Sequence, residues 1–166
     1  MVHGDDYASV GPRESLKWLK SKLRERFDIK TYTIRQRKED SKELKFLNRL
    51  IRATENGYEY EADPRHAELV IKGMKLNPKE SKPVVAPGAN GVGDDGEGVE
   101  LDYERMKAYK RIVARANCVA PDRPDAQYAI KELCRKMNNP SLADWNRLKH
   151  LARYFIARPR LVIQYD

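Results

Sequence analysis

Apolar positions repeat with helical spacing in five stretches of the chain. The spacing predicts amphipathic helices over residues 12–27, 64–76, 102–119, 124–137 and 142–157. In each stretch one stripe of aliphatic or aromatic residues would face a core, and the charged residues would face solvent. The second half of the chain is therefore predicted to be largely helical, with its own core.

Shorter apolar runs predict strands between and after these helices. Residues 29–34 are rich in β-branched and aromatic side chains, and 44–54 contain a second run of this kind. Asn56-Gly57 is the residue pair most typical of a two-residue hairpin turn. Residues 161–165 form a final apolar strand that needs a partner sheet. Helices and strands together predict an α+β fold.

The run after Asn56-Gly57 alternates in polarity. Tyr58, Tyr60 and Ala62 occupy every second position, and Glu59 and Glu61 lie between them. This alternation is typical of a half-buried strand, with the tyrosines on one face and the glutamates on the other.

Residues 77–99 differ from the rest of the chain in composition. They are rich in proline, glycine and charged residues, and no helical or strand period continues through them. Such a segment predicts a flexible linker between two regions. It also contains Asp94-Asp95, whose flanking glycines and lack of neighbouring strands favour an ordinary loop over a metal site.

The charge of the chain is strongly positive. Its 166 residues carry a formal net charge of +8, with a sequence pI near 9.4. An acid-rich stretch at 93–104 makes the remaining segments more cationic than this average. A positive excess favours a polyanionic partner such as nucleic acid, since each neutralised phosphate releases counterions. A basic protein without such a partner is the alternative.

Membrane and metal signals are weak in this sequence. No apolar run reaches the length of a membrane span, and the N-terminus lacks the features of a secretion signal. We therefore expect no membrane partner and an intracellular location, cytoplasmic or nuclear. Cys118 and Cys134 lack metal-site spacing and are expected to be small core residues in a reducing compartment.

An adjacent aspartate pair, Asp5-Asp6, stands between two short apolar segments near the N-terminus. The pattern predicts two strands joined by a tight turn, with both carboxylates at its tip. Clustered carboxylates are costly unless a hard divalent cation offsets their repulsion, so the pair is a candidate metal site. Solvated turn residues are the alternative, because aspartate is common in turns.

The aspartate pair is part of the first of three separated sequence blocks. They are His3-Gly4-Asp5-Asp6-Tyr7, then Tyr109-Lys110-Arg111-Ile112-Val113-Ala114, then Arg123-Pro124-Asp125-Ala126-Gln127-Tyr128-Ala129. In this order they resemble the C-terminal part of a copia-type retrotransposon reverse transcriptase. That family carries aromatic-x-Asp-Asp, Tyr-Arg-x-(Ile/Val)-Val-Gly and Arg-Pro-Asp-(Ile/Leu)-x-(Tyr/Phe)-Ala. The chain departs from it at Gly4, where Val or Met is usual, and at His3, where Tyr is common.

The resemblance implies a domain order. Residues 1–62 would be the C-terminal part of the polymerase palm, including an incomplete palm hairpin. Residues 63–76 would be a thumb-like helix, 77–99 the flexible linker, and 100–166 a three-helix connection towards an RNase H domain. Upstream fingers and palm, and the RNase H domain, would be further parts of a Pol polyprotein.

The same resemblance implies site residues. Asp5 would be the principal ligand of catalytic Mg²⁺ and Asp6 its supporting neighbour, with a third carboxylate from an upstream strand. An RNA or DNA template–primer would be the partner. The candidate nucleic-acid contacts are Arg65, Lys72, Lys75, Lys110, Arg111 and Arg115.

Two functions remain open at this point. The chain could be a fragment of an RNA-directed DNA polymerase, a nucleotidyltransferase that is inactive without its upstream palm and fingers. It could instead be a catalytically inactive nucleic-acid-binding remnant of a truncated retroelement.

Overall fold

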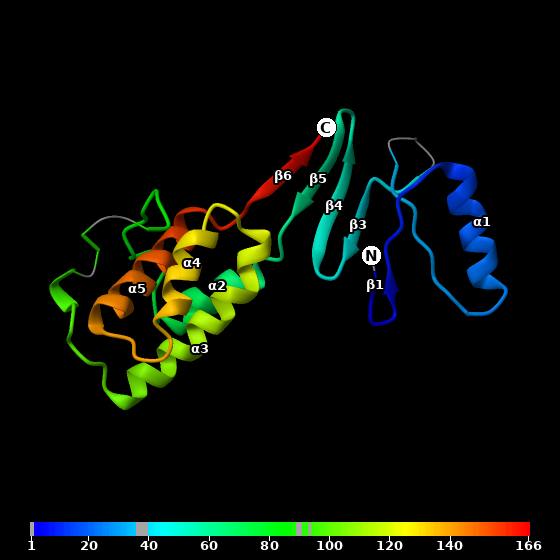
Figure 1. Ribbon diagram of the computed structural model, residues 1–166. Coiled ribbons are helices and arrows are strands. Elements are labelled where there is room, and N and C mark those ends of the chain that lie inside the picture. Colours follow the sequence, from blue (N-terminus) through cyan, green and yellow to red (C-terminus); the bar gives the residue numbers. More distant parts are fainter. Residues whose placement is uncertain (1, 36–39, 89–90, 93) are drawn as a thin grey trace.

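The computed structural model describes residues 2–35, 40–88, 91–92 and 94–166, and it confirms the predicted α+β fold. Figure 1 shows a small hairpin and a lone helix at one end, a sheet in the middle and a helical region at the other end. In chain order the elements are β1 (Val2–His3), β2 (Asp6–Tyr7), α1 (Arg13–Arg24), β3 (Glu43–Phe46), β4 (Arg49–Thr54), β5 (Gly57–Glu61), α2 (Arg65–Gly73), the 3-10 turn η1 (Asp94–Gly96), α3 (Tyr103–Val119), the 3-10 turn η2 (Ala120–Asp122), α4 (Gln127–Arg135), α5 (Leu142–Ala157) and β6 (Val162–Tyr165).

The hydrophobic core lies among α2, α3, α4 and α5, as the apolar stripes predict. Large side chains from all four helices are fully buried there: Val70, Tyr109, Ile112, Ile130, Leu148, Leu151 and Phe155. The buried hydroxyl of Tyr109 donates a 2.9 Å hydrogen bond to the carbonyl of Leu133, so its burial leaves no polar atom unsatisfied. A capping box between Ser141 and Asp144 begins α5.

Four antiparallel strands form the central sheet in the order β3-β4-β5-β6. A two-residue hairpin joins β4 to β5, as predicted, but the pairing of Thr54 with Gly57 makes Glu55 and Asn56 its turn residues and places Gly57 at the start of β5. The final strand β6 pairs with β5 from Tyr58↔Tyr165 to Glu61↔Val162. The partner sheet that the final strand needs is therefore supplied by this chain.

One strand prediction is corrected by the structure and another is extended. Residues 29–34 contain no strand, and Ile34 forms only an isolated bridge with Ser41. Residues 44–54 contain the predicted strand, β4, and also most of β3. They are separated by a turn in which Leu47 and Asn48 have φ of 50° and 64°. Two positive φ values are the mark of a type I′ hairpin turn, which a leucine does not signal in a sequence.

Two predictions of burial are wrong. Glu61, on the glutamate face of its strand, is only 8% exposed because Arg52 and Arg160 lie beside its carboxylate. Cys118 is exposed on α3 and is not a core residue. Cys134 is half-buried and packs against the core, as expected.

No described helix has the combination of length and apolar composition needed to cross a membrane.

Helix α1 forms where its apolar spacing predicts, but its apolar face does not enter a core. None of its side chains is buried, and Leu16, Leu19 and Leu23 are only half-buried. No other described helix or strand packs against α1. The N-terminal hairpin and α1 therefore add no side chain to the core of the helical region.

The described parts of 77–99 lie along α5 at several points. The ring of His150 is 3.0 Å from the carbonyl of Ala86, and Glu97 forms an ion pair with Arg147. Gly96 is packed so closely against the start of α5 that an added Cβ would lie 2.6 Å from the backbone nitrogen of Ala143. The flexibility expected for this segment stays a prediction.

Candidate functional site

The β1–β2 hairpin presents the two carboxylates of the candidate metal motif. His3 pairs with Asp6, which leaves Gly4 and Asp5 as the two turn residues. Gly4 has a φ of 57°, a left-handed value that glycine adopts without a steric penalty. A positive φ at the first turn residue alone is the pattern of a type II′ hairpin. Asp5 therefore lies at the tip and Asp6 begins β2, and both side chains are exposed.

Two carboxylates suit Mg²⁺ in chemistry, but two carboxylates alone do not make a two-metal centre. Carboxylate oxygens are the donors that Mg²⁺ prefers, and one or two carboxylates can hold it together with water and phosphate oxygens. Two ions that clamp a reacting phosphate need more ligands than this. Across the described residues, no group of three or more His, Cys, Asp or Glu side chains is placed to hold a metal.

The second candidate site is a basic surface formed by α2 and α3. The two helices run antiparallel along each other. Near one end Ala67 and Val119 line the same small cavity, and further along Gly73 lies against Ile112, where an added Cβ would be 2.9 Å from Cγ1. Because α2 and α3 pack against each other here, the side chains on the faces of the two helices that point away from the core flank this contact. We call these faces the outer side of the helix pair.

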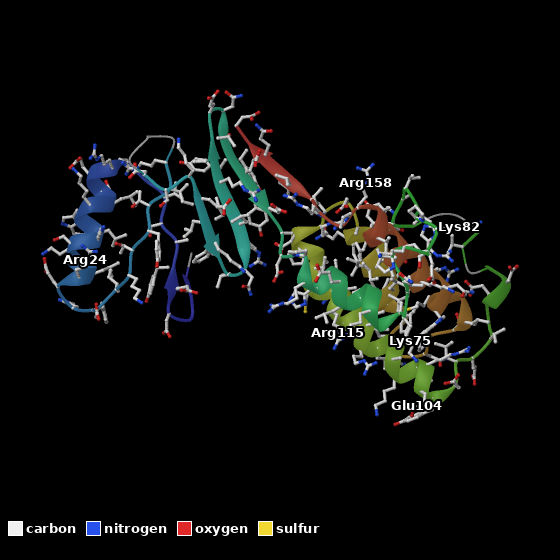
Figure 2. The ribbon with its side chains drawn as sticks, turned by 180° about the vertical axis from the view of Figure 1, so that it is seen from behind. Arg24, Lys75, Lys82, Glu104, Arg115 and Arg158 are labelled. Carbon is white, nitrogen blue, oxygen red and sulfur yellow. The ribbon has the colours of Figure 1, made fainter. Side chains whose placement is uncertain are left out.

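Helical spacing places several cations on that outer side. On α3, Arg111 and Arg115 are one turn apart, and Lys107 precedes them by one turn. On α2, Lys72 lies opposite the buried Val70, and Lys75 follows just after the helix. Figure 2 shows Lys75 and Arg115 in the part of the helical region where α2 and α3 lie. We call Lys72, Lys75, Lys107, Arg111 and Arg115 the α2–α3 basic surface.

The α2–α3 basic surface has unneutralised charge. No acidic side chain in the described part of the chain forms an ion pair with any of its five cations. Two exposed carboxylates, Glu68 and Glu104, lie on the same two helices. Five cations against two carboxylates leave a positive patch that suits phosphate groups.

Two of the predicted contacts are placed differently. Arg65 lies at the start of α2, where its guanidinium is 3.5 Å from the carboxylate of Asp63 and part of its charge is offset. Lys110 lies on the other flank of α3, because five residues at 3.6 per turn place it about 140° around the helix from Arg115. The other four predicted contacts, Lys72, Lys75, Arg111 and Arg115, lie on or just after the packed helices α2 and α3, whereas Asp5 and Asp6 lie in a separate hairpin.

A polar cluster that the sequence does not signal joins the sheet to the helical region. Both oxygens of the Asp122 carboxylate lie 3.0 Å from Nε of Arg49, and Tyr60 donates to the same carboxylate at 2.6 Å. Burial and the hydrogen bond to Asp122 both raise the pKa of Tyr60, so it stays a neutral donor. These residues are 62 or more positions from Asp122 in sequence, so only the fold reveals the cluster.

Arg123 and Asp125 form a buried structural pair. Arg123 is 2% exposed, its Nη2 lies 2.9 Å from Asp125, and its guanidinium lies 5.0 Å from the ring centre of Phe155. Burial opposes ionisation of Asp125, but hydrogen bonds from Arg123 and Tyr154 outweigh it and lower its pKa. This pair, the most recognisable part of the third sequence block, thus stabilises the turn before α4 and is closed to a ligand.

Comparisons with known proteins give a partial match. Over 52 residues the chain is 35% identical to the Uncharacterized mitochondrial protein AtMg00810 of Arabidopsis thaliana. The matched segment is 31% of this chain and 22% of that protein, so the chain spans about a fifth of its length. No protein family and no solved structure matches the chain. The similarity relates one segment to a plant mitochondrial protein and carries no activity with it.

Proposed function

We propose that this chain is part of a copia-type retroelement reverse transcriptase and that it binds nucleic acid. The observation that carries the proposal is the β1–β2 hairpin, whose two-residue turn exposes Asp5 and Asp6 together. Nucleotidyl transfer on two metal ions needs ligands for those ions, and carboxylates held together on a hairpin can supply part of the set. The ordered sequence blocks downstream of the hairpin support the same origin.

Each aspartate has a distinct role in this proposal. Asp5, at the tip of the turn, is the principal ligand, and Asp6, held in β2 by its pairing with His3, is the supporting ligand. Bound Mg²⁺ would supply stabilisation of charge on the reacting phosphate. A further carboxylate from outside the described residues completes the centre.

The α2–α3 basic surface holds the template–primer in this proposal. Its side chains contact phosphates and fix the position of the duplex without reading its sequence. Arg65, at the start of α2, extends this contact, and Lys110 serves a different strand or duplex segment on the other flank of α3. Binding of this kind weakens as salt rises, because phosphate contacts release counterions.

The polymerase assignment is tested on the reading frame that contains this chain. If the frame continues upstream and encodes another strand with an aspartate, the longer protein should extend a DNA primer on an RNA template in the presence of Mg²⁺. Asp5→Asn should abolish extension, and Asp95→Asn, in the η1 turn, should leave it unchanged. Stop codons upstream, or extension that survives Asp5→Asn, would contradict the assignment.

A second function, a non-catalytic nucleic-acid-binding remnant, is favoured by one observation. Asp5 and Asp6 have no third metal-ligating side chain beside them among the described residues. If the chain is such a remnant, it binds duplex, but neither it nor any longer protein encoded by the same reading frame extends a primer. The two functions share the α2–α3 basic surface and differ only in catalysis.

A further inference from the structure

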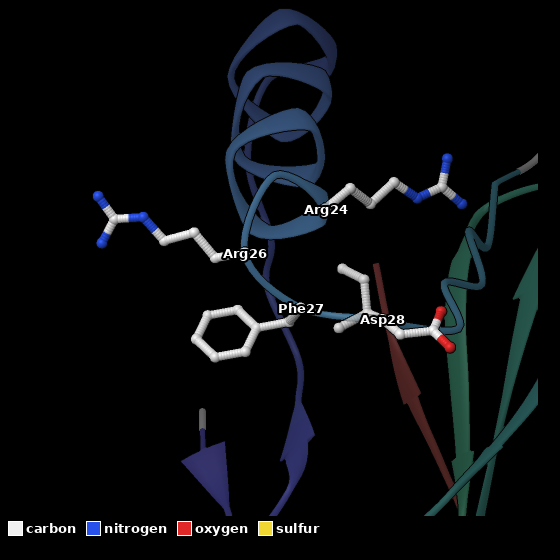
Figure 3. Close-up of a pocket in the computed structure, with 5 residues that line it drawn as sticks. Arg24, Arg26, Phe27 and Asp28 are labelled. Atoms are coloured by element: carbon white, nitrogen blue, oxygen red, sulfur yellow. The ribbon is translucent and has the colours of Figure 1, made fainter.

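The end of α1 carries an open hollow that neither the metal motif nor the α2–α3 basic surface uses. It has a volume of about 510 Å³ and is lined by Arg24, Arg26, Phe27, Asp28 and Ile29. Figure 3 shows Arg24 and Arg26 extending to opposite sides, with the ring of Phe27 on the side of Arg26 and Asp28 on the side of Arg24.

The backbone of this hollow is fixed by the end of the helix. The amides of Arg26 and Phe27 both donate to the carbonyl of Leu23, at 3.1 Å and 2.9 Å. Arg24 is held in place by a 3.3 Å hydrogen bond from its Nη2 to the hydroxyl of Thr31. The ring of Phe27 nevertheless stays 61% exposed. An aromatic ring is thus presented to solvent on an ordered backbone, beside a guanidinium.

We propose that this hollow binds one nucleotide of a single-stranded nucleic acid, with the base stacked on Phe27 and the adjoining phosphate on Arg26. The proposal deepens the nucleic-acid binding proposed above and rests on it for the class of ligand. Single-strand binding sites combine an aromatic stacking surface with cations that follow the backbone. The hollow has both in the consecutive residues Arg26 and Phe27, just after the end of α1.

The charges of the hollow decide which arginine takes the phosphate. Asp28 lies on the side of Arg24, where its carboxylate repels a phosphate and offsets the guanidinium. Among the described residues, Arg26 forms neither an ion pair nor a side-chain hydrogen bond. The helix dipole also attracts cations to this end of α1, so a guanidinium here does not by itself require a ligand. The exposed ring beside Arg26 is what points to a base.

Stacking and phosphate binding can be measured separately. The probes are a fluorescein-labelled 15-mer of deoxythymidine and an abasic 15-mer with the same phosphates, both read by fluorescence anisotropy at fixed salt. Phe27→Ala should weaken binding of the thymidine oligomer roughly 5- to 100-fold and leave the abasic oligomer unchanged. Arg26→Ala should weaken both and lower the salt slope of binding by about 0.7.

A control variant separates loss of stacking at Phe27 from the loss of any exposed aromatic ring. Tyr128→Ala removes another aromatic ring, 75% exposed on α4, and should change neither affinity. Because Phe27 is exposed, its replacement leaves the fold intact, which circular dichroism verifies. Equal affinity of Phe27→Ala and wild type for the thymidine oligomer would overturn the proposal. If the proposed function itself fails, wild type binds neither oligomer nor duplex, which is a different result.

Discussion

Tyr60 donates a 2.6 Å hydrogen bond to Asp122 and thereby ties strand β5 to the turn between α3 and α4. Arg49 on β4 donates hydrogen bonds to the same carboxylate, so both β4 and β5 are bonded to Asp122 in the helical region. In Figure 1 one end of the sheet meets the helical region, and most of the sheet extends away from the helices. The Asp122 carboxylate is therefore a side-chain link between the sheet and the helical region, in addition to the chain connections from β5 to α2 and from α5 to β6.

Asp122→Asn should destabilise the protein by about 1–3 kcal/mol. The substitution removes the charge that pairs with Arg49, whose side chain is only 30% exposed, and leaves a guanidinium without its anion. Urea unfolding followed by circular dichroism measures the loss. Glu132→Gln is the control, because its exposed pair with Arg135 should contribute less than about 1 kcal/mol. Equal effects of the two substitutions would show that Asp122 does not join the two regions.

Glu61 should make stability depend on acid pH. Hydrogen bonds from Arg160 and then Arg52 lower the pKa of Glu61 below its ordinary value of 4.5, against the opposing effect of burial. The resulting stabilisation is fully present above the unfolded-state pKa and is lost as pH falls through the lower folded-state pKa. Wild type should therefore exceed Glu61→Gln in urea midpoint at pH 7, and the difference should shrink below pH 4.5. A difference that is constant with pH would exclude this linkage.

Gly57→Ala should loosen the pairing of β5 with β6. Gly57 has a φ of 147°, and an added Cβ would lie 1.9 Å from the carbonyl oxygen of Tyr165. The clash forces the backbone of one strand to move, at a cost of about 1–3 kcal/mol. Amide hydrogen exchange should become faster in β6 than in wild type. Gly11→Ala is the control, since its added Cβ meets nothing within 4 Å; slower or unchanged exchange in β6 would contradict the prediction.

The helices were predictable because their signals are local. Apolar spacing, the Ser141 and Asp144 capping box and the hairpin signal at Asn56-Gly57 each act within a few residues, and the helices, the capping box and a β4–β5 hairpin with its turn at Glu55 and Asn56 are present in the structure. The burial of Glu61 was not predictable, because it depends on Arg160, which is 99 residues away. The type I′ turn at Leu47-Asn48 was missed for a different reason, since leucine rarely adopts positive φ.

The candidate site follows the same rule. Asp5 and Asp6 could be recognised from adjacent residues, and the structure shows them exposed on a hairpin. The grouping of Lys72 with Arg111 could not be read from sequence, because it depends on how α2 packs against α3. Lys107 was not predicted as a contact, and it belongs to the basic surface only because α2 packs beside that part of α3.

The most direct test of the central claim measures binding of a fluorescein-labelled RNA–DNA primer–template duplex to this chain over a range of salt. We predict that affinity falls with salt, and that Lys72→Ala/Arg111→Ala/Arg115→Ala reduces the slope of log K against log salt by about 2 to 3. The control Arg135→Ala/Lys136→Ala/Lys149→Ala removes the same charge from the C-terminal end of α4, the residue after it and α5, and it should leave most of the slope in place. Binding that is independent of salt, or equal slopes for the two triple variants, would contradict a nucleic-acid site on α2 and α3.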